Sequence, residues 1–147
     1  MDTIQFKSRN STIEDYRVTD ILINGYNLIE YIRGQEAQWF PVLGIRMPPG
    51  NYEGVPPLMS LPPKRHFWGF AAQCYQIEAG RIAVLENGQT GIPAQWTVSV
   101  EVVVDGEAVT WRHFRQEQLG MTYKHLEGFR FDLVDYKKAL DYAAASQ

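Results

Sequence analysis

The segment at residues 96–116, WTVSVEVVVDGEAVTWRHFRQ, constrains the fold more than any other part of the chain. Its valine-rich first half is typical of a β-strand, and the Asp-Gly pair that follows is a strong signal for a hairpin turn. A two-residue turn pairs Val100 with Trp111 and Val98 with His113, so that apolar residues gather on one face. We therefore expect an antiparallel hairpin that directs Trp111 into the core or the floor of a pocket.

The end of this return strand carries the densest mixture of cationic and titratable side chains. In the expected register, His113 and Arg115 lie on the face of the tryptophan, where the apolar pattern ends. Arg112 lies on the other face, in diagonal contact with Glu101. Arginine suits phosphorylated or carboxylated ligands because its planar guanidinium binds two oxygens at once. A site here requires a concave pocket beside His113 with a carboxylate such as Asp132. The alternative is a strand whose charged residues face water.

A second hairpin is expected in FAAQCYQIEAGRIAVLE, residues 70–86, around a turn at Ala79-Gly80. This turn places Glu78 opposite Arg81, an oppositely charged pair. Cys74 lies in the first of these strands. We interpret it as a buried, unreactive thiol rather than a nucleophile, because free cysteine is usually buried and no histidine neighbours it in sequence.

Two helices are expected, one near residues 28–38 and one near 133–145. Asn27 is a suitable N-cap for the first, and Glu30 follows it at the spacing of a capping box. Asp132 is the corresponding cap of the second, whose apolar residues recur at helical spacing.

Seven of the eight prolines fall within residues 41–63. Proline removes a backbone donor, so neither a long helix nor a central strand is expected there. We interpret this segment as an ordered loop that either presents Tyr52 at its tip for recognition or forms a rigid structural turn.

The N-terminal segment is expected to be partly ordered over residues 1–16, and residues 17–23 are predicted to form the first clear strand.

The order of these elements predicts the fold class. Helices kept apart from sequential hairpins indicate an α+β fold rather than an alternating parallel one. We expect a single domain over residues 1–147, with a mainly antiparallel sheet of about five to six strands and two helices. Its exposed edge strand offers a route to a homodimer.

Charge and motif content exclude several functions. The net charge of −3 argues against a nucleic-acid binder. A single cysteine excludes an intrachain disulfide and a multi-cysteine zinc site, and three dispersed histidines predict no metal site. No phosphate-binding loop, dinucleotide fingerprint or nucleophile elbow is present, so no cofactor is expected. The unpaired thiol, the polar N-terminus and the lack of a long apolar run predict a cytoplasmic protein that does not enter the membrane.

A second candidate patch is PPKRHFWGF, residues 62–70. One interpretation is a rim in which His66 and the neighbouring cations contact an acidic partner while Trp68 serves as an anchor. The alternative, which we favour, is a solvated lead-in whose aromatic residues enter the core.

The C-terminal half resembles a family of small bacterial proteins of unknown function. The similarity lies in a Val-x-Trp-x-x-Phe strand, a tyrosine and a leucine, a Phe-Asp pair and a closing helix, here Val109, Trp111, Phe114, Tyr123, Leu126, Phe131, Asp132, Tyr136, Ala139 and Leu140. ILINGYNLIEYI near the start is similar to the opening of that family. The cysteine-rich turn of many relatives is replaced here by NGQTGIPAQW, so no metal or redox role is implied for it. The resemblance implies a cytosolic accessory or binding role.

Together these features predict a non-enzymatic, protein-binding accessory or immunity-type domain. The alternative is a small enzyme or an anionic-ligand-binding protein with its site at Arg112, His113 and Arg115.

Overall fold

The computed structural model describes residues 1–12, 15–88 and 95–147. The segment NGQTGIPAQW, residues 87–96, therefore lies largely outside the described residues. The secondary-structure elements, in chain order, are β1 (Ile4–Asn10), β2 (Arg17–Ile23), β3 (Tyr26–Asn27), α1 (Leu28–Leu43), β4 (Tyr52–Gly54), α2 (Pro57–Ser60), the 3₁₀ turns η1 (His66–Trp68) and η2 (Gln73–Tyr75), β5 (Gln76–Glu78), β6 (Arg81–Asn87), β7 (Val98–Val104), β8 (Ala108–Gln116), β9 (Met121–Thr122), β10 (Phe129–Asp132) and α3 (Leu133–Ala145).

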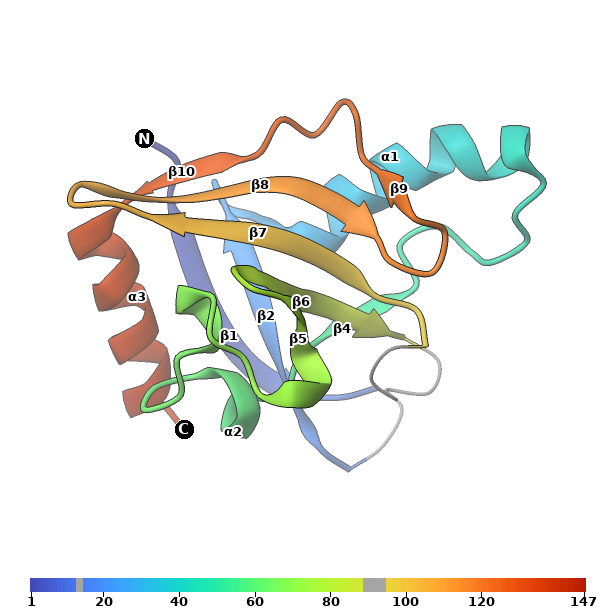
Figure 1. Ribbon diagram of the computed structural model, residues 1–147. Coiled ribbons are helices and arrows are strands. Elements are labelled where there is room, and N and C mark those ends of the chain that lie inside the picture. Colours follow the sequence, from blue (N-terminus) through green and yellow to red (C-terminus); the bar gives the residue numbers. More distant parts are fainter. Residues whose placement is uncertain (13–14, 89–94) are drawn as a thin grey trace.

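The strands form two antiparallel sheets (Figure 1), and one hydrophobic core contains residues of both. The smaller sheet has the order β1-β2-β3, and the larger has the order β10-β8-β7-β6-β4, with β5 paired to β6 and β9 to β8. Backbone hydrogen bonds join the sheets at two places. The Thr19 amide in β2 donates to the Val55 carbonyl beside β4, and the Asp2 amide before β1 donates to the Arg130 carbonyl in β10, both at 2.9 Å. The α+β fold is thus confirmed, with more strands than expected.

The helices lie at different sides of the strands (Figure 1). α3 packs against β1, β10 and β8, whereas α1 packs against β2 and β3. The core contains an aromatic cluster in which the Trp111 ring contacts Phe67, Phe131 and Tyr136. Among the helices of the described ranges, none combines the length and apolarity needed to span a bilayer.

Both expected helix starts are confirmed. The Asn27 side chain accepts a hydrogen bond from the Ile29 amide at 2.9 Å, and the Asp132 carboxylate caps α3. Glu30, however, pairs with Arg33. α1 also extends past residue 38 and through Pro41 to Leu43, and it ends at the left-handed C-cap Gly44.

The prediction of a proline-rich loop at residues 41–63 is only partly right. This segment contains the last turn of α1, strand β4 and the short helix α2. β4 forms between the prolines, where residues 50–55 contain none, and it pairs with β6. β1, in the first 16 residues, was also not expected as a strand. Its buried Ile4 and Phe6 alternate with exposed side chains, a pattern too short to be distinctive.

Candidate functional site

The β7–β8 hairpin differs from its expected register by two residues. Val102 pairs with Trp111, because the turn spans four residues, in which the Asp105 amide donates to the Ala108 carbonyl at 3.0 Å. The Asp105 carboxylate stabilises this turn by accepting from the Ala108 amide at 2.8 Å. A register shift of two residues does not by itself exchange the two faces of a strand. Trp111 is accordingly in the core, which is one of its two predicted positions, and its indole N–H donates to the Tyr136 hydroxyl at 3.1 Å.

A β-bulge then changes the faces of the candidate residues. The register shifts between the residues paired with Arg112 and Arg115, and His113 takes a left-handed conformation with φ of 55°. Phe114 therefore enters the core, while His113 is exposed and Arg115 lies on the outer face with Arg112. The prediction that His113 and Arg115 share the face of the buried tryptophan is wrong.

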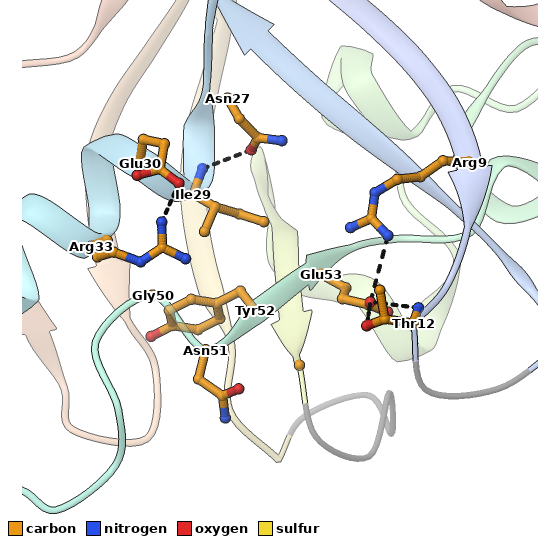
Figure 2. Close-up of a pocket in the computed structure, with 11 residues that line it drawn as sticks. Arg9, Thr12, Asn27, Ile29, Glu30, Arg33, Gly50, Asn51, Tyr52 and Glu53 are labelled. Atoms are coloured by element: carbon orange, nitrogen blue, oxygen red, sulfur yellow. Dashed lines mark hydrogen bonds and ion pairs between the residues drawn. The ribbon is translucent and has the colours of Figure 1, made fainter.

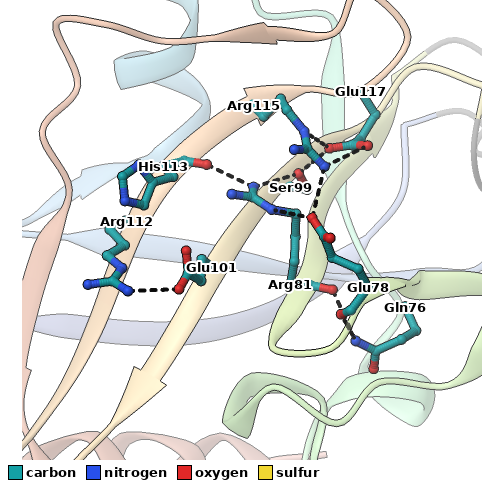
Figure 3. Close-up of polar contacts among 9 residues, drawn as sticks. All are labelled: Gln76, Glu78, Arg81, Ser99, Glu101, Arg112, His113, Arg115 and Glu117. Atoms are coloured by element: carbon teal, nitrogen blue, oxygen red, sulfur yellow. Dashed lines mark hydrogen bonds and ion pairs between the residues drawn. The ribbon is translucent and has the colours of Figure 1, made fainter.

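The three candidate residues belong to a network of charges on the outer face of the sheet (Figure 3). Arg112 pairs with Glu101 directly across the strands at 2.9 Å, so the expected contact is present although it is not diagonal. Arg115 pairs with Glu117 at 2.6 Å and with Glu78 at 3.4 Å. Each of these guanidinium groups is thus already held by a carboxylate.

Arg81 is the buried centre of this network, and sequence reasoning placed it only in a surface pair. Its predicted pairing opposite Glu78 is confirmed. Its side chain is only 7% exposed, and its guanidinium donates to the Ser99 hydroxyl at 3.0 Å and to the His113 carbonyl at 2.8 Å. Burial and the nearby Arg115 lower the pKa of Arg81. The guanidinium holds the carbonyl of the left-handed residue and thereby stabilises the bulge.

The carboxylate of Glu117 joins Ser99 in β7 to Arg115 in β8. It accepts hydrogen bonds from the Ser99 hydroxyl at 2.5 Å and from Arg115. Burial alone would raise the pKa of Glu117, but these hydrogen bonds and the adjacent arginines outweigh burial and lower it.

Asp132 does not belong to this network, because it pairs with Ala108 at the opposite end of β8 and caps α3. The pockets described below are lined by other residues. The arrangement suits a stabilising surface network better than an anionic-ligand site.

His66 is fully buried, which corrects its interpretation as part of an exposed rim. It lies in η1, between the rings of Phe67 and Tyr75, and its Nε2 lies 2.8 Å from the Ala83 carbonyl. Burial lowers the pKa of His66 to about 4, although the hydrogen bond to Ala83 opposes this. A neutral imidazole therefore belongs to the folded state.

His66 is expected to make the protein sensitive to acid. Because its pKa is lower in the folded state than in the unfolded chain, its contribution is fully present above about pH 6.5 and is lost as the pH falls toward 4. The loss should reach about 3 kcal/mol of unfolding free energy. Urea unfolding of wild type and His66→Gln at several pH values measures this pH-dependent loss of unfolding free energy, since glutamine keeps an amide donor but does not titrate. Equal pH slopes for the two proteins contradict the prediction, and His125→Gln, at an exposed position, is the control.

Tyr52 also departs from its predicted position. It is buried in β4 rather than presented at a loop tip. Its hydroxyl donates to the carboxylate of Glu36 at 2.5 Å, which also accepts from the Tyr123 hydroxyl at 2.6 Å and the Gly50 amide at 2.8 Å. Burial raises the pKa of Glu36, although these hydrogen bonds oppose the shift. This fully buried cluster connects α1, β4 and the residue after β9, and no sequence pattern indicated it.

A polar pocket of about 320 Å³ lies near the first turn of α1, and Figure 2 shows the residues that line it. Arg9 and Arg33 enter it, but Arg33 pairs with Glu30, and Arg9 lies 2.7 Å from Asp20 and 3.6 Å from Glu53. Hydrogen bonds from Ser11 and Thr12 also hold the Glu53 carboxylate. The charges in this pocket are therefore neutralised internally.

Trp68 is half-buried, with its ring 5.1 Å from that of Tyr136. Beside it Phe70 is 61% exposed, and the guanidinium carbon of Arg65 lies 4.4 Å from the centre of the Phe70 ring. These residues line a pocket of about 350 Å³ together with Val102, Val104 and two glycines. Phe67 enters the core, as one interpretation of residues 62–70 predicts for the aromatic residues. Phe70 and Arg65 instead face solvent.

Cys74 is exposed in η2, so its prediction as a buried thiol is wrong. The 3₁₀ turn replaces the expected strand and turns the side chain outward. Within the described ranges, no group of three or more His, Cys, Asp or Glu side chains is arranged to hold a metal ion.

No family model matches this sequence, and searches of curated proteins and of solved structures found no significant similarity to it. The resemblance to a family of small bacterial proteins therefore stays a prediction.

Proposed function

We propose that this chain is a non-enzymatic protein-binding domain, an accessory or immunity-type protein of the cytoplasm. It contacts its partner through the Phe70 patch, which we define as Arg65, Trp68, Phe70, Val102 and Val104. The observation that carries the proposal is the exposed Phe70 ring beneath the Arg65 guanidinium, beside an open pocket. Aromatic residues and arginine are the residue types that most often dominate the binding energy of protein interfaces.

The surroundings of the patch support this assignment. Val104, at the end of β7, is 44% exposed, so the apolar surface extends beyond a single ring. Trp68 rests on Tyr136 in the core, which gives the patch a rigid base. A rigid aromatic group loses little conformational entropy on binding. The candidate arginines at the bulge, in contrast, are engaged by carboxylates, which favours a binding role for the chain over catalysis there.

The test is capture of partners by the immobilised protein from a lysate of the source cells, followed by affinity measurement with the purified partner. Phe70→Asp is expected to raise the dissociation constant at least about tenfold, because it removes an anchor and buries a charge. Val134→Asp, at a 58% exposed position on α3, is the matched control and should bind like wild type. Equal binding by Phe70→Asp, or no partner alongside turnover in a substrate screen, would reject the proposal.

A further inference from the structure

A groove runs between β1 and α3, on residues that the Phe70 patch does not include. It consists of two adjoining cavities of about 540 and 290 Å³ that share Phe6, Lys7 and Tyr142. Phe6 is buried and forms part of its floor, and α3 forms one wall. We call it the β1–α3 groove. It is therefore an extended surface depression beside a strand and a helix, two rigid elements.

The charge of the β1–α3 groove is opposite to that of the whole chain. Lys7, Arg17 and Lys138 line it, and Asp135 is the one acidic side chain among its lining residues. Within the described part of the chain, none of these three cations forms an ion pair, unlike the arginines of the two charged clusters above. The chain as a whole carries a net charge of −3. These cations attract an acidic ligand to the groove although the chain as a whole is negative.

The groove also presents an apolar contact. The Tyr142 side chain, where the two cavities meet, is 76% exposed. Tyrosine combines a large apolar area with low conformational entropy and is enriched at protein interfaces. A ligand that fits the groove therefore combines carboxylates with at least one apolar side chain.

From the cations and the exposed tyrosine we infer that the β1–α3 groove binds an acidic segment of a partner protein that carries an apolar side chain. The carboxylates pair with Lys7 and Lys138, and the apolar side chain covers Tyr142. A peptide is favoured over a nucleic acid because the net-negative chain lacks the broad positive field that retains a polyanion. The groove and the Phe70 patch are separate, so either assignment stands or fails without the other.

The experiment selects short random peptides displayed on phage against the full-length chain, then measures the synthetic peptides by fluorescence anisotropy. Selected sequences are expected to be rich in Asp and Glu around an aliphatic or aromatic residue. The double variant Lys7→Glu/Lys138→Glu should weaken binding at least about tenfold, with a strong salt dependence in wild type. Tyr142→Ser should weaken it several-fold without altering stability, because the side chain is exposed.

A charge-matched control is available in the same chain. Lys64→Glu/Lys124→Glu makes the same change in net charge at two exposed lysines outside the groove, and it should bind like wild type. Equal loss in both double variants, selected peptides without acidic residues, or no selected peptide at all overturns the inference. Binding of a single-stranded oligonucleotide that depends on Lys7 and Lys138, without peptide binding, also overturns it. None of these results changes the outcome of the Phe70→Asp measurement.

Discussion

Replacing Gly54 with alanine is expected to lower the free energy of unfolding by about 3 kcal/mol, the upper end of the usual cost of overpacking. Gly54 lies in β4, where this strand crosses closest to β2. A Cβ atom built on it would lie 1.8 Å from the Thr19 carbonyl oxygen and 2.7 Å from the carbonyl carbon. Because both obstacles are backbone atoms, no rotation of a side chain relieves the clash. The strands must separate, and the adjacent hydrogen bond between the Thr19 amide and the Val55 carbonyl is lost.

Gly34→Ala is the matched control for this substitution. Gly34 lies in α1, and nothing lies within 4 Å of a Cβ atom built on it. Alanine should therefore stabilise the protein, by about 0.5–1 kcal/mol, because it restricts the unfolded chain and favours the helix. Urea unfolding should show that the unfolding free energy falls in Gly54→Ala and rises in Gly34→Ala. A loss below about 1 kcal/mol in Gly54→Ala would contradict the close approach of β2 and β4.

Replacing Glu36 with alanine is expected to lower the unfolding free energy by about 3–5 kcal/mol. The Glu36 carboxylate accepts hydrogen bonds from the Tyr52 hydroxyl, the Tyr123 hydroxyl and the Gly50 amide, and all these partners are buried. Alanine removes the shared acceptor of these three hydrogen bonds and creates a cavity. Glu36→Gln keeps the volume and one acceptor oxygen, so it should cause a smaller loss. Denaturant unfolding near neutral pH measures both variants.

The control for Glu36 lies on the same helix. Glu30 is exposed, and its ion pair with Arg33 lies at the surface, so Glu30→Ala should change stability by no more than about 0.5 kcal/mol. Similar losses in Glu30→Ala and Glu36→Ala would reject a structural role for the buried carboxylate.

Protonation of Glu36 in acid should favour the folded state, since burial raises the pKa of Glu36 and protonation removes the buried charge. This dependence is opposite in sign to that of His66.

Local patterns predicted several elements well because short-range physics decides them. The caps at Asn27 and Asp132 act within a few residues of their own helix, and both are present. Trp111 was predicted to be buried from strand alternation alone, and the two-residue error in register preserved its face. The α+β class followed likewise from the order of helices and hairpins, although β1 was missed.

The candidate site was harder to predict because a single inserted residue reverses the faces of a strand. The bulge at His113 moves Arg115 to the outer face, and its stability depends on Arg81, which lies 32 residues earlier. Tyr52 lies in a proline-rich segment that resembled a loop, yet its hydroxyl reaches Glu36 on α1. Neither contact has a periodicity that a sequence pattern could reveal.

Local patterns were sufficient to predict the class of fold, the helix starts and the burial of Trp111, since propensity, capping and alternation act over a few residues. Long-range packing establishes which polar residues are buried, which aromatic rings are exposed and which cations share a groove. His66 and Phe70 illustrate this, four residues apart in one basic-aromatic segment, one enclosed by the core and the other open to solvent. The packing of distant strands and helices sets the environment of each side chain, and that environment determines whether it stabilises the fold or binds a partner.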